Sequence, residues 1–220
     1  MATTRLDRAQ VVDTALRLLN ELGLNGLTLR RIAKELNVQA PALYWHFKNK
    51  QELLDEMATE MFRRMVEPPE AWPAGASWQE QIGASCRALR RGLLRYREGA
   101  KVFSGTRYTG RDHDPYLEKH LQALVGAGFT VAEATQAYFT SYAFTIGFVI
   151  EEQAVYPEPG ERDPRYDPAE RAAGIGPDYP LAAAAGEHFF TGYEERFEAG
   201  LRIVLAGVEQ VRGGGGPSGS

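Results

Sequence analysis

Basic and hydrogen-bonding side chains gather in one short stretch near the N-terminus of this sequence. Its aromatic part is the run Tyr44-Trp45-His46, which puts three amphipathic rings on a segment too short to bury all of them. The polar residues around this run are Arg30, Gln39, Lys48 and Lys50. Guanidinium, amide and ammonium groups are donors that contact phosphates and the edges of bases. The stretch is therefore a candidate for nucleic-acid binding.

The charge of the chain is divided unevenly along its length. The formal net charge is −4 over 220 residues, yet residues 1–50 hold eight Lys and Arg against four acidic residues. This segment is therefore at +4 and the remainder at −8. Such asymmetry is typical of a small anion-binding region on an acidic body, although an ordinary solvated surface can also carry a modest basic excess. Charge alone does not decide between the two.

The remaining reactive residues do not form a catalytic or metal-binding pattern. The four histidines, at positions 46, 113, 120 and 188, are scattered, and neither a Gly-rich phosphate loop nor a motif around a nucleophile is present. The lone Cys86 excludes an intramolecular disulfide and a zinc site built from cysteines. We therefore expect no catalytic activity, no cofactor and no bound metal.

Composition and hydropathy indicate a globular protein inside the cell. Hydrophobic residues make up 44% and charged residues 25% of the chain, close to the averages of folded domains. The first residues carry charges where a secretory signal needs an apolar run. The longest uncharged stretch, residues 134–150, is interrupted by polar residues and is shorter than the about 20 apolar residues of a membrane span. We expect a cytoplasmic location and a buried helix at 134–150.

Signals for helix starts recur throughout the chain. The pairs with the spacing of a capping box are Asp7 with Gln10, Ser77 with Glu80, and Thr130 with Glu133, and further N-cap residues are Thr28 and Asn49. The predicted helices span about 8–23, 29–36, 40–46, 50–66, 78–97, 114–126 and 131–155, with a last helix from about 182 or 187 to 212. No segment alternates with period two over strand length, so the sequence predicts an all-α protein.

Two segments rich in proline interrupt the helical pattern. One follows residue 66 and is the expected boundary between two parts of the chain. The other, residues 157–180, holds six prolines and is predicted to be a surface loop. We therefore divide the chain into a three-helix domain at 1–48, a connecting helix at 49–66, a larger helical domain at 67–212 and a flexible Gly-rich tail at 213–220.

The predicted helices at 29–36 and 40–46 have the lengths and the short connection of a helix-turn-helix. In that motif the second helix enters the major groove of DNA. An ordinary helical hairpin would have the same lengths. The basic and aromatic residues on the side expected to be exposed favour the DNA-binding interpretation for residues 1–48.

Three stretches of the sequence resemble one protein family. The residues NGLTLRRIAKELNVQAPALYWHFKNKQELLD at 25–55 resemble the N-terminal domain of the TetR family of bacterial repressors. LLRYREGAKV at 93–102 with GTR at 105–107, and FTIGFVIEEQ at 144–153, resemble the tetracycline-repressor branch of that family. The resemblance implies a ligand-responsive transcriptional repressor that binds a palindromic operator in double-stranded DNA as a homodimer. It also implies that residues 67–212 bind a small effector and form the dimer.

The resemblance places the dimer interface on the helices at about 130–155 and 187–212. The last helix carries an apolar stripe from Phe189 to Val208, which is more than it needs to pack on its own domain, although a plain core stripe would look the same. We expect Phe197 and Leu201 to face the partner.

The resemblance also assigns contacts with DNA. Residues at positions that meet base edges are Arg30, Gln39, Ala40 and Ala42. Residues at positions that contact the DNA backbone are Thr28, Tyr44, Trp45, His46 and Lys50. Arg suits guanine, Gln suits adenine, and a small Ala can meet a thymine methyl group. Because the tetracycline repressors carry other residues at positions 39, 40 and 42, we expect a different operator.

In the effector site the resemblance holds only in part. The residues that match drug contacts of the tetracycline repressors are Thr106, Arg107 and Glu151. Contact positions where this chain differs are Val66, Ser85, Leu89, Phe103 and His120, and further aromatic area is expected from Phe139 and Tyr142. Phe103 replaces the histidine that ligates the drug's magnesium ion, and a phenyl ring has no lone pair for a metal. We therefore predict a largely aromatic effector bound without a metal, rather than magnesium-tetracycline.

Two other functions fit the same sequence. One is a DNA-binding regulator without an effector, and the other is a helical carrier or enzyme for an aromatic metabolite that retains the N-terminal domain. Binding to DNA without any response to metabolites would favour the first, and turnover of a bound molecule would favour the second.

Overall fold

The computed structural model describes residues 6–67, 72, 75–158 and 160–214, and every regular element in this part of the chain is a helix. In chain order these are α1 (Arg8–Gly26), α2 (Leu29–Glu35), α3 (Ala40–Tyr44), α4 (Lys50–Val66), α5 (Trp78–Leu93), α6 (Gly99–Phe103), α7 (His113–Gly126), α8 (Val131–Val155), the short 3-10 helix η1 (Pro164–Tyr166), α9 (Pro168–Ile175), α10 (Pro180–Phe190) and α11 (Tyr193–Gly214). The predicted all-α fold is confirmed. None of the described helices is long and apolar enough to cross a membrane.

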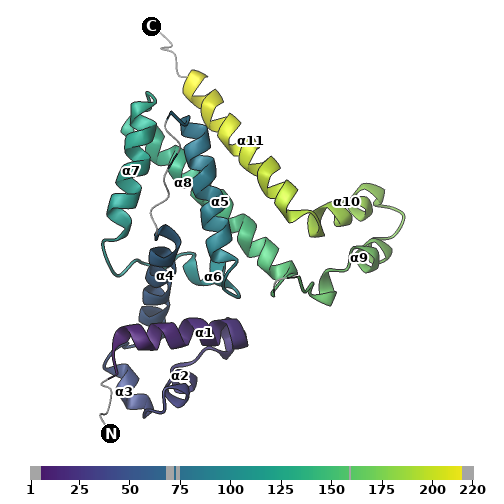
Figure 1. Cartoon of the computed structure of the whole chain (residues 1–220). Helices are drawn as coiled ribbons and strands as arrows, with labels where there is room; N and C mark the ends of the chain where they lie inside the picture. Colours follow the sequence, from purple (N-terminus) through teal and green to yellow (C-terminus); the bar gives the residue numbers. More distant parts are fainter. Residues whose placement is uncertain (1–5, 68–71, 73–74, 159, 215–220) are drawn as a thin grey trace.

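The first three helices pack together beneath α4 and form a head, residues 6–48 (Figure 1). Asp7 and Gln10 form the predicted capping box at the start of α1. The chain turns between α2 and α3 at Asn37, whose φ of 53° lies in the left-handed region that Asn tolerates better than most residues. Leu43 and Phe47 are fully buried and join α3 to the core of the head. The short α2, the tight turn and α3 make the predicted helix-turn-helix.

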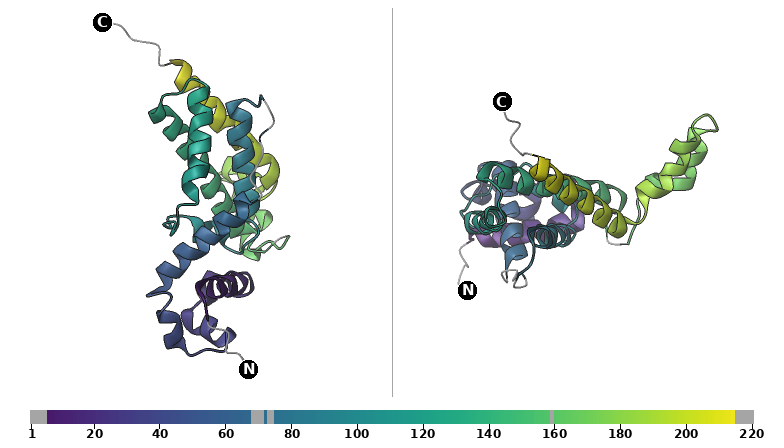
Figure 2. Two further views of the ribbon diagram at one scale, coloured as in Figure 1. Left: turned by 60° about the vertical axis from the view of Figure 1, so that its left-hand side comes forward. Right: turned by 90° about the horizontal axis from the view of Figure 1, so that it is seen from above.

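Helix α4 leads from the head to the body, which we define as residues 75–214 (Figure 2). In the body, α8 packs against α5, α7 and α11. One apolar core runs from the head through α4 to α6 and the middle of α8. A second core lies between α5, α7, α8 and α11, and includes Trp78, Phe129 and Phe197. The head and the lower body therefore share a continuous core through α4.

The prediction of a loop at residues 157–180 is wrong in part. This segment contains η1 and α9, and α9 pairs with α10 to form an arm that projects away from the rest of the body (Figure 2). Both helices begin with a proline, at Pro168 and Pro180, where the missing N–H is not needed for a helical hydrogen bond. Asp167 caps α9 by accepting from the backbone N–H groups of Ala169 and Glu170. The prolines therefore start short helices instead of preventing them.

Two further helix boundaries differ from the prediction. The expected last helix is divided into α10 and α11 at Thr191-Gly192, where Gly192 has a φ of 61°. The short helix α6 was not predicted, and it follows Glu98, whose φ of 53° is uncommon for a residue other than glycine. Most of the proline-rich segment after residue 67 lies outside the described residues, as do residues 215–220 of the expected tail, while α11 extends to Gly214.

Candidate functional site

The head presents the predicted DNA-binding residues from α2, α3 and the turn after α3. Arg30 is exposed on α2, and Gln39 is the N-cap residue of α3 without a side-chain capping hydrogen bond. Tyr44 and Trp45 are 52% and 89% exposed. The half-buried members of the predicted set are Ala40, Ala42 and His46. Exposure of an indole forgoes the free energy that burial would provide, so the position of Trp45 favours a partner outside the chain.

Some of the predicted DNA contacts also hold the head together. The Thr28 hydroxyl accepts from the backbone N–H of Arg31 at 3.1 Å and caps α2. The Lys50 ammonium donates to the carbonyl oxygen of Leu24 at 2.9 Å. The backbone N–H of Leu24 in turn donates to the Glu98 carboxylate of the body at 2.7 Å. Lys50 is therefore tied to the junction of head and body, and its contact with DNA stays a prediction.

A cavity of about 280 Å³ lies where the end of α4 meets α5 and α7. Its lining residues are Phe62, Met65, Val66, Trp72, Ala88, Leu89, Asp112, Pro115, Tyr116, Lys119 and His120. A second, much smaller cavity of about 30 Å³ is lined in part by Ser85, Leu89, His120 and Tyr142. The structure thus brings together five of the predicted effector contacts: Val66, Ser85, Leu89, His120 and Tyr142. Leu89 and His120 belong to the walls of both cavities.

His120 is buried between the two cavities and hydrogen-bonded at both ring nitrogens. Nδ1 lies 2.7 Å from the carbonyl oxygen of Tyr116, and Nε2 lies 2.7 Å from Oγ of Ser85. Burial lowers the pKa of His120 to about 4, so the ring is neutral at pH 7. Because a carbonyl only accepts, Nδ1 carries the hydrogen and Nε2 is the acceptor. The Ser85 hydroxyl has one hydrogen, which it can donate either to His120 or to the carbonyl of Gln81 at 3.0 Å.

The other predicted effector contacts lie outside the walls of these two cavities. Phe103 is buried against Tyr108, with ring centroids 5.8 Å apart, and the Thr106 hydroxyl donates to the carbonyl oxygen of Phe103 at 2.8 Å. The exposed members of the predicted set are Arg107, Phe139 and Glu151. The interpretation of all five as ligand contacts stays a prediction.

Sequence reasoning missed several residues on the cavity wall. Trp72, Asp112, Tyr116 and Lys119 have no motif around them. Trp72 lies within the proline-rich segment, which was interpreted only as a boundary. The helical spacing of Phe62 with the pair Met65 and Val66 at the end of α4 is the one signal that indicates an apolar wall here.

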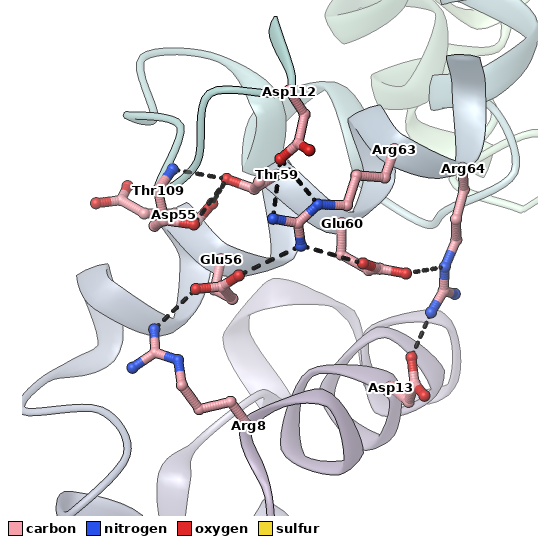
Figure 3. Close-up of polar contacts among 10 residues, drawn as sticks. All are labelled: Arg8, Asp13, Asp55, Glu56, Thr59, Glu60, Arg63, Arg64, Thr109 and Asp112. Carbon is pink, nitrogen blue, oxygen red and sulfur yellow. Dashed lines mark hydrogen bonds and ion pairs between the residues drawn. The ribbon is translucent and has the colours of Figure 1, made fainter. Parts of the chain in front are cut away.

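A chain of ion pairs connects the cavity wall with the head (Figure 3). Asp112, on the wall, lies 3.0 Å from the Arg63 guanidinium of α4. Arg63 also lies 3.6 Å from Glu56, and Glu56 lies 2.8 Å from Arg8 of α1. The Arg8 guanidinium donates to the carbonyl oxygen of His46, next to Trp45, at 2.5 Å. Charged groups therefore lead without a break from the cavity to the end of α3.

Further polar contacts hold α4 on both sides (Figure 3). On the side of the head, Arg64 bridges Glu60 of its own helix and Asp13 of α1. On the side of the body, the backbone N–H of Thr109 donates to the Thr59 hydroxyl at 2.9 Å. Helix α4 therefore touches the head and the segment between α6 and α7 at the same time.

The structure corrects the prediction that Phe197 and Leu201 face a partner. Both are buried in their own chain, with exposures of 0% and 1%. The ring of Phe197 stacks on Phe144 at 5.6 Å, and the Arg90 guanidinium lies 5.0 Å from its centroid. The apolar stripe of the last helix therefore faces inward at these positions, which is the plain core stripe that the sequence could not distinguish.

Other apolar residues of α8 and α11 remain exposed. They are Val131, Phe139, Ile203 and Val211, with exposures of 66%, 60%, 73% and 79%. A hollow of about 420 Å³ lies between these two helices, and Ile203, Gly207 and Val211 are among its lining residues. Exposed apolar area of this kind is typical of a surface that another protein covers.

The fold and these sites define a class of protein. A helix-turn-helix with exposed basic and aromatic residues, joined by one helix to a body with an internal cavity, is the architecture of a DNA-binding regulator that senses a small molecule. Two family models match the chain. Residues 11–57 match bacterial regulatory proteins of the tetR family, and residues 72–212 match the Tetracyclin repressor-like C-terminal domain. The chain belongs to the TetR family.

Relatives with known names or structures agree with this assignment. Tetracycline repressor protein class C of Escherichia coli is 38% identical over 212 residues, which cover 94% of this chain and 93% of the relative. The structure of a possible TetR family transcriptional regulator from Streptomyces coelicolor A3(2) is 38% identical, with a TM-score of 0.81 over 93% of this chain and 100% of that chain. The Streptomyces coelicolor TetR family protein ActR, solved in complex with (S)-DNPA, is 26% identical, with a TM-score of 0.76 over 94% of this chain and 99% of that chain.

The resemblance stated from the sequence is therefore confirmed. The chain is a transcriptional repressor of the TetR family. The relatives described above are regulators and not enzymes.

Proposed function

We propose that a homodimer of this chain represses transcription at a palindromic operator and leaves it when an aromatic effector enters the cavity between α4, α5 and α7. The observation that carries this proposal is the chain of ion pairs from Asp112 through Arg63 and Glu56 to Arg8. These ion pairs connect both the cavity wall and the head to the same helix, α4. The protein acts in the cytoplasm on DNA and catalyses no reaction.

On the DNA, we assign the two kinds of contact to different residues of the head. Arg30 and Gln39 contact base edges, because both side chains are exposed and suit guanine and adenine. Tyr44 and Trp45 contact the sugar-phosphate backbone from the exposed end of α3. The two heads of a dimer are related by a twofold axis, so the half-sites of the operator form a palindrome.

The effector cavity favours an aromatic compound. Most lining residues are apolar or aromatic, and polar groups are few, as is usual for sites that bind small molecules. The described residues contain no cluster of three or more His, Cys, Asp or Glu side chains that could hold a metal ion. The residue at the position of the magnesium ligand, Phe103, packs against Tyr108. These features support an effector other than magnesium-tetracycline.

Release from DNA follows from the position of α4. An effector in the cavity pushes on Phe62, Met65 and Val66 of α4 and on Asp112 of the opposite wall. If the effector binds more tightly to an arrangement with a shifted α4, it moves the head away from the spacing that the operator requires. The extent of release is limited by the difference in effector affinity between the two arrangements.

The dimer is proposed to form through the exposed face of α8 and α11, around Ile203, Gly207 and Val211. A Cβ atom built on Gly207 would meet no other atom within 4 Å, so this part of α11 is open to close approach by a partner helix. This proposal keeps the predicted pair of helices and replaces the predicted residues.

The experiment that tests the function is a titration of operator DNA, first isolated by selection from random duplexes. We expect binding of a palindrome by a dimer, with affinity that falls steeply as salt rises. Arg30→Ala should lose about 1 to 3 kcal/mol on the selected site and relax the preference at one base pair. A panel of polyketide-like aromatic compounds should release the DNA, whereas tetracycline should not, with or without magnesium. Micromolar, magnesium-dependent release by tetracycline would overturn the assignment of the effector class.

A further inference from the structure

Ser85 and His120 form a buried hydrogen-bonded pair between the two cavities. Oγ of Ser85 lies 2.7 Å from Nε2 of His120, and Nδ1 of His120 lies 2.7 Å from the carbonyl oxygen of Tyr116. Both side chains line the cavity of about 30 Å³, and His120 also lines the cavity of about 280 Å³. The pair therefore lies where the larger cavity adjoins the smaller one.

The pair has two hydrogens on polar atoms, and both are used within the protein. Burial lowers the pKa of His120 to about 4, so its ring carries a single N–H at pH 7. That hydrogen is on Nδ1, because the carbonyl oxygen of Tyr116 can only accept. The hydroxyl hydrogen of Ser85 points either to Nε2 of His120 or to the carbonyl oxygen of Gln81, which lies 3.0 Å away. An acceptor atom of a ligand therefore finds no hydrogen at this pair.

The same pair has more acceptor capacity than the protein fills. If the Ser85 hydrogen points to His120, the lone pairs of Oγ stay open, because no other group in the described part of the chain donates to this oxygen. If the hydrogen points to Gln81, the lone pair of Nε2 stays open instead. A buried acceptor without a donor has lost its hydrogen bonds to water. In both arrangements, a ligand that donates a hydrogen bond therefore finds an open acceptor here.

The other polar side chains around the smaller cavity do not reverse this preference. The thiol of Cys86 donates to the carbonyl oxygen of Ser141 at 3.7 Å, and the Ser141 hydroxyl donates to the carbonyl oxygen of Ala137 at 2.9 Å. The hydroxyls of Tyr138 and Tyr142 can turn to donate or to accept, so they fit either kind of ligand. The selection is therefore made by Ser85 and His120.

The two cavities differ in what they can hold. The smaller one, of about 30 Å³, has room for a single oxygen atom with its hydrogen and not for a ring. The larger one, of about 280 Å³ and mainly apolar, has room for an aromatic body of fused rings. Leu89, Tyr116 and His120 line both cavities, so the two spaces are neighbours. One molecule with its rings in the larger cavity can thus place a small substituent in the smaller one.

We propose that the effector is a hydroxyaromatic compound, whose phenolic hydroxyl donates a hydrogen bond to the pair of Ser85 and His120. This inference rests on the proposed function in one respect, that the effector occupies the cavity between α4, α5 and α7. A phenol keeps its hydrogen at pH 7, because its pKa is about 10. A carboxylate at the same place meets only acceptors and is repelled. The site therefore selects both the rings and the polar group of its effector.

The test uses naphthol, fluoronaphthalene and methylnaphthalene, each substituted at the same ring position by a group of similar size. The hydroxyl can donate, fluorine can only accept weakly, and the methyl group can do neither. Calorimetry with naphthol, and displacement of naphthol by the other two, measure the affinities for the full chain at pH 7. We expect naphthol to bind about three- to tenfold more tightly than either of the others, which is the range of one net hydrogen bond.

The double variant Ser85→Ala/His120→Phe removes every acceptor of the pair and keeps its volume nearly filled. The preference for naphthol over fluoronaphthalene should then fall below about twofold. Ser85→Ala alone should keep the preference, because the hydroxyl of naphthol can then donate directly to Nε2 of His120. Ser141→Ala is the matched control, since Ser141 is a buried serine of the same cavity wall whose hydroxyl bonds to its own helix. It should keep the preference of the wild type.

Nitrogen NMR of the histidine rings tests the placement of the hydrogens directly. The ring of His120, assigned by its absence in His120→Phe, should carry its hydrogen on Nδ1 at pH 7, both without and with naphthol. A hydrogen on Nε2, or a charged ring, would overturn the proposal, because Ser85 would then accept a hydrogen from within the protein.

The affinities can overturn the proposal in four ways. These are equal binding of naphthol and fluoronaphthalene, a preference that survives in the double variant, a preference lost in Ser141→Ala, and no binding of naphthol at millimolar concentration. If the double variant does not fold, the probes on wild type and on Ser85→Ala, together with the ring NMR, still decide.

Operator titration in parallel keeps this inference separate from the proposed function. A protein that is released from its operator equally well by aromatic compounds with and without a hydroxyl retains the proposed function and loses this inference. A protein that binds no palindromic DNA loses the proposed function, whereas the probe affinities still decide whether the pair of Ser85 and His120 selects a donor.

Discussion

The head and the body use aromatic side chains in opposite ways. In the head, Tyr44 and Trp45 stand at the end of α3 and are largely exposed. In the body, the rings of Tyr116 and His120 pack together with centroids 4.3 Å apart, and Phe62 of α4 packs against Tyr116 at 5.3 Å. Exposed rings suit a large partner that stays outside the protein, whereas enclosed rings suit a small molecule that enters it.

The body also differs from the head because several of its ionisable side chains are buried, which disfavours their charged forms. Burial raises the pKa of Tyr108 and of Tyr138 and lowers the pKa of His113 and of His120. In each case the environment favours the neutral form, as expected for groups removed from water. A polar group of a ligand must therefore find a matching partner in the body, while the polar groups of the head remain solvated until DNA arrives. The head is therefore suited to a charged partner such as DNA, whereas the body is suited to a small molecule whose polar groups match those of the protein.

The largest expected effect concerns a third kind of surface, the exposed apolar face of α8 and α11. We expect Ile203→Lys with Val211→Lys to give a folded monomer, because both side chains are exposed in the single chain and would bury unpaired charges only in a dimer. Operator affinity should then fall by a factor on the order of 100 or more, since the two heads no longer bind as one unit. Sedimentation and DNA titration measure the two effects.

Val125→Lys is the control, because Val125 is an exposed apolar residue of α7. It should remain dimeric and bind DNA normally. Phe197→Lys is unsuitable for this purpose, since Phe197 is fully buried in its own chain and its replacement would unfold the body. A dimeric Ile203→Lys/Val211→Lys protein would place the interface elsewhere and leave the exposed rings of the head as the next candidate surface for self-association.

A smaller effect should appear in the pH dependence of the free energy of unfolding, which tests whether water is excluded from His120 in the body. His120 has a pKa of about 4 in the folded chain against an ordinary value of 6.5. The unfolded chain therefore binds a proton at His120 more readily than the folded chain does. The stability that depends on neutral His120 is complete above pH 6.5 and is lost as the pH falls toward 4. The loss should reach about 3 kcal/mol at pH 4. Urea unfolding between pH 4 and pH 7 measures it.

His120→Asn should reduce this slope, because the amide can still donate to the carbonyl of Tyr116 but does not titrate. His188→Gln, at an exposed position on α10, is the control and should keep the slope of wild type. If the pH dependence of the free energy of unfolding were the same in His120→Asn and wild type, His120 would be hydrated in the folded protein. The contrast between buried polar groups in the body and solvated ones in the head would then lose its main support.

The sequence predicted the features that depend on neighbouring residues. The capping boxes at Asp7, Ser77 and Thr130 are present, and the helix-turn-helix lies where the N-cap Thr28 and the short spacing placed it. Local hydrogen bonds decide these features, so the local sequence is sufficient. The short helices α6 and α9 were missed because five or eight residues are too few to display a helical period.

Features that depend on packing between distant segments could not be predicted in the same way. The stripe around Phe197 was recognised as apolar, but only the position of Phe144 and Arg90 shows that it faces the core. The place of Trp72 on the cavity wall is defined by its contacts with Lys119 and His120, which come from α7. The resemblance to relatives located Val66, Ser85, Leu89 and His120 on the walls of the two cavities, yet it gave no indication of Trp72, which has no motif around it.

The smallest expected effect concerns the ion pairs that join the two regions. Arg63→Met removes the link between Asp112 and Glu56 and keeps most of the side chain's length. These pairs are partly exposed, with side-chain exposures of 37% for Arg63 and 46% for Asp112, so we expect a loss of stability of no more than about 1 kcal/mol. The affinity for operator should change little. The ratio of operator affinities without and with effector should fall by about two- to fivefold, since one of several contacts between cavity and head is lost.

Arg8→Met breaks the same chain of ion pairs at its other end, where Glu56 meets the head. If the chain transmits the response, the double variant Arg8→Met/Arg63→Met should lose no more of the response than either single variant, because both act on one path. Arg17→Met, which breaks surface ion pairs with Glu21 and Glu35 within the head, is the control and should leave the response intact. Additive losses from Arg8→Met and Arg63→Met would show that the cavity and the head are coupled through the packed core around α4, and that the ion pairs only stabilise each region on its own.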